Sequence, residues 1–146
     1  MEVPWLEKEI LYLELETIKI MSKKIISTEK SPVAIGPYSQ AILAGDTLYC
    51  SGQIAINPET GNLITDSITE ETKQVMKNIS EVLKAADMNF CNVVKCSIFM
   101  KDMNQYVEIN QVYASFFSEN PPAREAVQVS VLPKNVNVEI SVIAVK

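Results

Sequence analysis

The C-terminal part of the chain contains two segments in which apolar and polar residues alternate, and this pattern constrains the fold more than any other feature. Side chains of a β-strand point to its two faces in turn, so each segment predicts a strand with one apolar face. We expect that apolar face to lie against helices, so that Arg124 and Glu139, which have the opposite parity, point together to the other face of the sheet. The two predicted strands cover residues 124–132 and 136–145, and their alternating apolar residues are Val127, Val129 and Val131, then Val136, Val138, Ile140 and Val142.

Two segments have the apolar spacing of amphipathic helices. The first is predicted over Ser67–Asp87, where Ser67 and Glu70 form a capping-box pattern ahead of a regular apolar face. The second is predicted after Asp102, with a stripe of mainly aromatic residues that we assign to the core: Tyr106, Ile109, Tyr113 and Phe116 or Phe117. Residues 120–122, Asn-Pro-Pro, end this helix.

Shorter apolar runs predict the remaining strands, over residues 24–27, 39–43, 47–51 and 93–100, with a hairpin between the second and third runs. The fold class is therefore α+β, a single domain with a mixed sheet of about six strands and two helices. Two helices can cover only one face of such a sheet. Because Ile143 and Val145 lie on the other face, we expect another copy of the chain to cover it, giving a homo-oligomer.

The amino-acid composition limits the catalytic groups and the ligands that this chain can use. The chain has no histidine, which excludes Ser-His-Asp and Cys-His catalysis, imidazole bases and histidine metal ligands. Any catalyst must use Glu, Asp, Lys, Tyr, Ser, Cys or main-chain groups. The net charge is −5 and the 13 Lys and Arg residues are scattered, which disfavours nucleic-acid binding.

The three cysteines, Cys50, Cys91 and Cys96, are odd in number and form no Cys-x-x-Cys pair. We interpret them as reduced, partly buried thiols, and we expect an intracellular, cytoplasmic protein.

Residues 1–21 differ from the rest of the chain. This segment is apolar but carries five glutamates, so it cannot cross a membrane, and it lacks the features of a signal peptide. Two interpretations stay open: an amphipathic helix that packs on the body or on a partner, or upstream sequence read in frame ahead of a start at Met21. The domain itself is predicted over residues 22–146.

Five short motifs, in this order and spacing, resemble the Rid family of reactive intermediate deaminases, also called the YjgF family. The resemblance extends from about Met21 to Lys146. The motifs are Gly36-Pro37-Tyr38-Ser39-Gln40-Ala41, Ser51-Gly52-Gln53-Ile54, Pro122-Ala123-Arg124, Leu132-Pro133 and Val138-Glu139-Ile140.

The resemblance implies a chorismate-mutase-like fold and a homotrimer with three clefts between subunits. It implies hydrolysis of 2-imino and enamine acids, those derived from 2-aminoacrylate and 2-aminocrotonate, to 2-keto acids and ammonia. Such intermediates escape from pyridoxal-phosphate-dependent dehydratases, which gives a functional link to those enzymes. No cofactor and no metal are implied.

The resemblance also implies roles for individual residues. Arg124 would grip the substrate carboxylate, and Glu139 would orient the attacking water. Tyr38 would line the cleft. The other implied site residues are Ser51 and Gly52 beside the ligand, Asn110 on the second helix, and Ala126, where some members have cysteine and where only the backbone can contribute.

Two other functions remain as alternatives. One is a non-catalytic trimer of the same fold that binds small ligands or regulates other proteins. The other is an RNA-directed role in translation inhibition or ribonuclease activity, which the acidic balance and the missing histidines disfavour.

Overall fold

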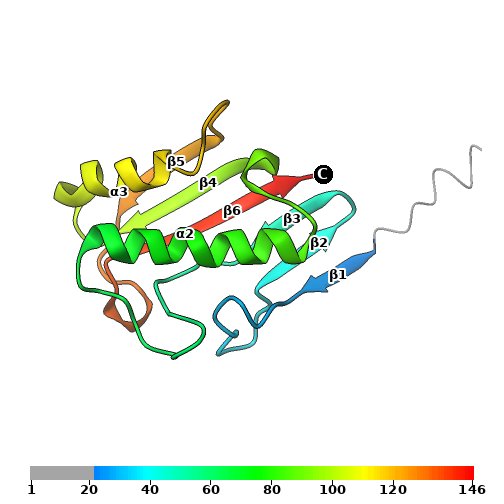
Figure 1. Cartoon of the computed structure of the whole chain (residues 1–146), viewed down its shortest axis with the longest axis horizontal. Coiled ribbons are helices and arrows are strands. Elements are labelled where there is room, and N and C mark those ends of the chain that lie inside the picture. The colour runs from blue at the N-terminus through cyan, green and yellow to red at the C-terminus, as the bar shows by residue number, and fades with distance from the viewer. Residues whose placement is uncertain (1–21) are drawn as a thin grey trace, which may run out of the picture.

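Six strands form one mixed sheet in the computed structural model of the chain, which describes residues 22–146 (Figure 1). The order across the sheet is β1-β2-β3-β6-β4-β5; only β4 and β5 pair in parallel, and all other neighbours are antiparallel. The helix predicted within residues 1–21 lies outside the described residues. The strands are β1 (Lys23–Ile26), β2 (Ala41–Ala44), β3 (Thr47–Cys50), β4 (Val93–Met100), β5 (Ala123–Gln128) and β6 (Val138–Val145).

Helix α2 (Ile68–Ala85) crosses one face of the sheet, and the shorter α3 (Tyr106–Ala114) lies beside it (Figure 1). The predicted cap of α2 is confirmed, since the Ser67 hydroxyl accepts a hydrogen bond from the Glu70 backbone N–H at 3.2 Å. Three 3₁₀ turns complete the fold: η1 (Phe90–Asn92), η2 (Met103–Gln105) and η3 (Pro133–Asn135). The α+β fold and the predicted hairpin are confirmed.

Strand β6 follows the predicted parity. Val138, Ile140 and Val142 are buried beneath the helices, whereas Glu139 points to the opposite face, which we call the open face. The same core contains the apolar side of α2 and the alternate residues of β4.

Strand β5 shows that the predicted orientation of Arg124, toward the face of the sheet opposite the helices, is wrong. Arg124 pairs in register with the buried Cys96 and lies on the helix face, while Val127 pairs with Phe99 and is exposed on the open face. The strand also ends at Gln128, so Val129 and Val131 lie beyond it. Alternation defines two faces of a strand but does not tell which one the helices cover. At the β5 edge of the sheet, the charged side chain of Arg124 therefore lies on the face that the helices cover.

The open face carries an apolar row that runs across four strands. Ile25, Ile42, Tyr49 and Ile143 are neighbours in register, and Ile25 and Tyr49 are 64% and 52% exposed. A row of this kind is typical of a surface that another molecule covers. The expectation of a homo-oligomer therefore keeps its physical basis.

The described residues place the cysteines in two environments. Cys50 and Cys96 are buried and Cys91 is exposed, so the prediction of partly buried thiols is wrong for Cys91; all three are free of disulfide bonds. Burial raises the pKa of the Cys50 thiol to about 12, which keeps it protonated and unreactive. No helix within residues 22–146 is long and apolar enough to cross a membrane.

Candidate functional site

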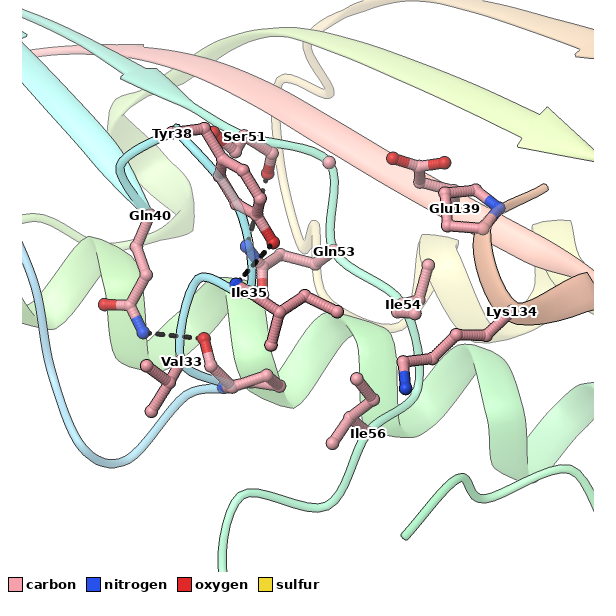
Figure 2. A pocket seen from close by; sticks show the side chains of 13 residues that line it. Val33, Ile35, Tyr38, Gln40, Ser51, Gln53, Ile54, Ile56, Lys134 and Glu139 are labelled. Carbon is pink, nitrogen blue, oxygen red and sulfur yellow. Dashed lines mark hydrogen bonds between the residues drawn. The ribbon is translucent and has the colours of Figure 1, made fainter. Parts of the chain in front are cut away.

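A cleft of about 380 Å³ opens beside Glu139 (Figure 2). Glu139 and Lys134 lie at one side of it, and the segment from Ser51 to Ile56 runs along another. Its walls are otherwise mostly apolar, with Val33, Ile35, Ile54 and Ile56 among them. The cleft therefore presents the Glu139 carboxylate, the Lys134 ammonium group and a few neutral polar groups to a ligand that would otherwise touch mainly hydrocarbon.

Glu139 packs directly against Gly52. A Cβ atom built on Gly52 would lie 1.9 Å from Oε1 and 2.8 Å from Cδ of Glu139, so only glycine leaves room for this carboxylate. The backbone of Gln53 fixes the approach, because its N–H donates to the Ile140 carbonyl at 2.8 Å and its carbonyl accepts from the Ile140 N–H at 3.1 Å. Burial raises the pKa of Glu139 above its usual value, which makes the carboxylate a better base.

Replacing Gly52 with alanine should displace the Glu139 carboxylate, because the added methyl would overlap it. We expect the rate of any reaction that uses Glu139 as a base to fall by about tenfold or more, the size of effect that a misplaced base produces. The control is the same change in a Glu139→Gln background, where it should cost much less. An equal loss in both backgrounds would show that Gly52 does not act through Glu139.

Two buried glutamines that the sequence analysis did not single out organise the cleft wall. The Gln40 side chain donates to the carbonyls of Thr28, Ser31 and Pro32 and accepts from the Thr28 N–H. Gln53 accepts from the Ser31 hydroxyl and donates to the Ser51 carbonyl. Both glutamines lie within motifs that carry the family resemblance, and their position next to Tyr38 and Gly52 was the available signal.

Tyr38 and Ser51, both predicted site residues, line the same cleft (Figure 2). The Tyr38 ring is 51% exposed, and its hydroxyl accepts only a long contact of 3.5 Å from the Ile35 N–H. The Ser51 hydroxyl donates to the Ser39 carbonyl at 2.6 Å. The tyrosine hydroxyl is thus available to a ligand, whereas the serine hydrogen is already engaged.

A fully buried carboxylate anchors the start of β6. Glu71 on α2 accepts hydrogen bonds from the Asn137 backbone N–H and side-chain amide, both at 2.7 Å, and from the Val138 N–H at 3.3 Å. A buried carboxylate whose oxygens accept hydrogen bonds in this way holds the donating backbone groups in place. Glu71 therefore holds the chain immediately ahead of Glu139.

Arg124 forms a second polar centre on the helix face. Its Nη1 donates to Asn110 Oδ1 and its Nη2 donates to the Tyr106 hydroxyl, both at 2.7 Å. The guanidinium carbon lies 4.9 Å from the centre of the Tyr113 ring. The structure thus brings the predicted residues Arg124 and Asn110 together and adds Tyr106, which the sequence analysis assigned to the core.

The guanidinium of Arg124 is half-buried and faces no carboxylate. No Asp or Glu within residues 22–146 forms an ion pair with it. A guanidinium has five N–H donors and two of them are used here, so three remain for a ligand. A guanidinium that is positively charged, has only neutral partners and keeps unused N–H donors is suited to bind a carboxylate.

Arg124 and Glu139 cannot act on one small molecule within a single chain, contrary to the prediction that they share a face. In register, Arg124 pairs with Cys96 of β4 and Glu139 pairs with Phe99 of the same strand. Three residues along β4 and two strand spacings separate their Cα atoms by about 14 Å. Their side chains also leave opposite faces of the sheet. Ala126 lies with Arg124 on the helix side of β5 and packs against the core.

No group of His, Cys, Asp or Glu side chains within residues 22–146 is arranged to hold a metal ion. The chemistry available at the two polar centres is that of the Glu139 carboxylate, the Lys134 ammonium group, the Arg124 guanidinium, hydroxyl and amide groups, and the backbone.

Residues 28–146 match the family described as endoribonuclease L-PSP. The chain is 46% identical over 124 residues to human 2-iminobutanoate/2-iminopropanoate deaminase, covering 85% of this chain and 90% of the human protein. Identity to the bovine protein of the same name is 49% over 124 residues, with the same coverage of 85% and 90%. The crystal structure of a Rid family protein of Yersinia pestis superposes with a TM-score of 0.84 at 47% identity, covering 86% of this chain and all of that one.

Proposed function

The chain belongs to the Rid family, and from this membership and the geometry of the two polar centres we propose that it hydrolyses reactive 2-imino and enamine acids to 2-keto acids and ammonia. The substrates are those derived from 2-aminoacrylate and 2-aminocrotonate. The observation that carries this proposal is the guanidinium of Arg124, held by Tyr106 and Asn110 with three donors free and no acidic partner within the described residues. The human and bovine relatives, named for this activity, add support.

In this proposal the substrate carboxylate binds to Arg124, and the carbon of the protonated imine lies beside Glu139. Glu139 accepts a proton from water as the water oxygen adds to that carbon, which forms a tetrahedral carbinolamine. Glu139 then passes this proton to the nitrogen, and as the carbon–nitrogen bond breaks the hydroxyl group gives up its proton to Glu139, so that ammonia and a 2-keto acid are released. An enamine first becomes an imine by protonation at its β-carbon.

The residues at hand are sufficient for this reaction. Imines hydrolyse in water without a catalyst, so the enzyme needs to supply only a few kcal/mol. Positioning and one general base typically give rate factors of about 10² to 10⁴. The raised pKa of Glu139 makes its carboxylate a stronger base than an ordinary glutamate.

The proposed site lies between copies of the chain. Within one chain Arg124 and Glu139 are on opposite faces of the sheet, so a small substrate can reach both only if they come from two subunits. The apolar open face and the unpaired edge strand β5 are the surfaces that such an assembly would cover. We propose the homotrimer typical of the family, with Ala126 contributing backbone groups at this edge.

The direct test is ammonia release from freshly generated 2-iminobutanoate and 2-iminopropanoate, measured beside RNA cleavage with the same preparation. We expect rapid 2-keto acid and ammonia formation and no cleavage of RNA. Slow hydrolysis equal to that in buffer, with tight 2-keto acid binding, would favour the non-catalytic ligand-binding alternative instead. RNA cleavage that co-purifies with the protein and no deamination would favour the RNA-directed alternative.

A further inference from the structure

The hydroxyl of Tyr106 and the amide oxygen of Asn110 form a pair of acceptors on α3 for the Arg124 side chain. The two residues are four positions apart, so they lie one above the other on the same face of the helix. Each accepts one N–H at 2.7 Å, from Nη2 and Nη1 respectively. The two terminal nitrogens of the guanidinium are therefore both held from the same side.

The Tyr106 hydroxyl is a rigid acceptor because its backbone is fixed. Asp102 caps the preceding turn by accepting from the Asn104 N–H at 2.9 Å, and the Tyr106 N–H donates to the Met103 carbonyl. The ring is half-buried and packs against the hydrophobic core. With few side-chain torsions left free, the hydroxyl defines where Nη2 lies.

The contact has no evident structural requirement of its own. The guanidinium already lies over the Tyr113 ring at 4.9 Å, and Arg124 lies on the edge strand, where its charge has access to solvent. A phenylalanine at position 106 would keep the core packing. What the hydroxyl adds is an orientation of the guanidinium plane.

We propose that Tyr106 is a positioning residue for carboxylate recognition: its hydroxyl fixes the plane of the Arg124 guanidinium so that a pair of its remaining donors faces the incoming carboxylate. This inference rests on the proposed function, since it assigns the ligand of Arg124 to the substrate carboxylate. Without the hydroxyl, the guanidinium can rotate about its side-chain torsions, and one of its donors is left without a partner.

The test compares Tyr106→Phe with the wild-type protein in binding of 2-oxobutanoate by titration calorimetry and in kcat and KM for 2-iminobutanoate. We expect 2-oxobutanoate to bind roughly tenfold more weakly, the effect of losing one charge-assisted hydrogen bond. KM should rise more than kcat falls, and the melting temperature should stay the same. Tyr113→Phe is the matched comparison, because its hydroxyl makes no hydrogen bond to Arg124, and it should lose less affinity.

A double-mutant cycle separates positioning from a general structural effect. In an Arg124→Lys background the Tyr106→Phe change should lower kcat/KM by less than twofold, because the planar fork that it positions is gone. Wild-type affinity in Tyr106→Phe, or an equal loss in both backgrounds, would overturn this inference and leave the proposed function intact. A wild-type protein that neither binds 2-oxobutanoate nor deaminates imines would overturn both.

Discussion

Replacing Arg124 with lysine should lower kcat/KM for 2-imino acids by about 10- to 10³-fold and leave the assembly unchanged. Lysine keeps the positive charge but has only three donors on one nitrogen, so it cannot keep the bonds to Tyr106 and Asn110 and also give a carboxylate two parallel hydrogen bonds. Charge-assisted hydrogen bonds are worth about 1.5–3 kcal/mol each, and the loss of one or two gives this range. The measurement is imine turnover together with affinity for 2-keto acids.

The control for Arg124→Lys is the oligomeric state, measured by light scattering. Arg124 makes its hydrogen bonds within its own chain, so the substitution should leave the assembly intact. Wild-type turnover and wild-type affinity for 2-keto acids in this variant would show that the arginine is structural and would contradict the proposed mechanism.

Replacing Glu139 with glutamine should lower turnover by about 10²- to 10⁴-fold while 2-keto acids still bind. The amide keeps the shape of the side chain beside Gly52 but cannot accept a proton from water. Because burial raises the pKa of Glu139, wild-type activity should increase with pH as the carboxyl group loses its proton through that raised pKa. The pH dependence should disappear in Glu139→Gln.

The outcome that would contradict this role is a Glu139→Gln variant with the same turnover and the same pH profile as the wild-type protein. A variant that lost turnover and 2-keto acid affinity to the same degree would show that Glu139 shapes the cleft and does not act as a base.

The sequence was most informative where one physical rule decides the outcome. The N-terminal cap predicted at Ser67 is confirmed, since its hydroxyl accepts from the Glu70 N–H, and so is the alternation of buried and partly exposed residues in β6. The family resemblance implies that Gly52 lies beside the ligand, and the structure places this glycine in the cleft, against Glu139. Local patterns of this kind predict an element and which of its residues share a face, but not which face the helices cover.

The placement of Arg124 depended on information that no local pattern contains. The valines of residues 124–132 alternate regularly, but parity cannot tell which face of an edge strand meets the helices. Tyr106 was assigned to the core for the same reason: its ring does pack there, and only the tertiary fold brings its hydroxyl to Arg124. The spacing of four residues between Tyr106 and Asn110, which places both on one face of a helix, was the one sequence signal that could have indicated that Tyr106 also lies near Arg124.

The central claim is that Arg124 of one subunit and Glu139 of another complete each site, and mixed assemblies test it most directly. Chains carrying Arg124→Lys and chains carrying Glu139→Gln are co-expressed with different tags, and assemblies containing both are purified and assayed. A site that pairs the intact Arg124 of one chain with the intact Glu139 of the other regains activity. Each purified mixed trimer contains two chains of one kind and one of the other, so one of its three sites should regain wild-type activity, about one third of the wild-type sites. Activity no higher than that of the two variants assayed separately would place both residues in one subunit's site and contradict the account.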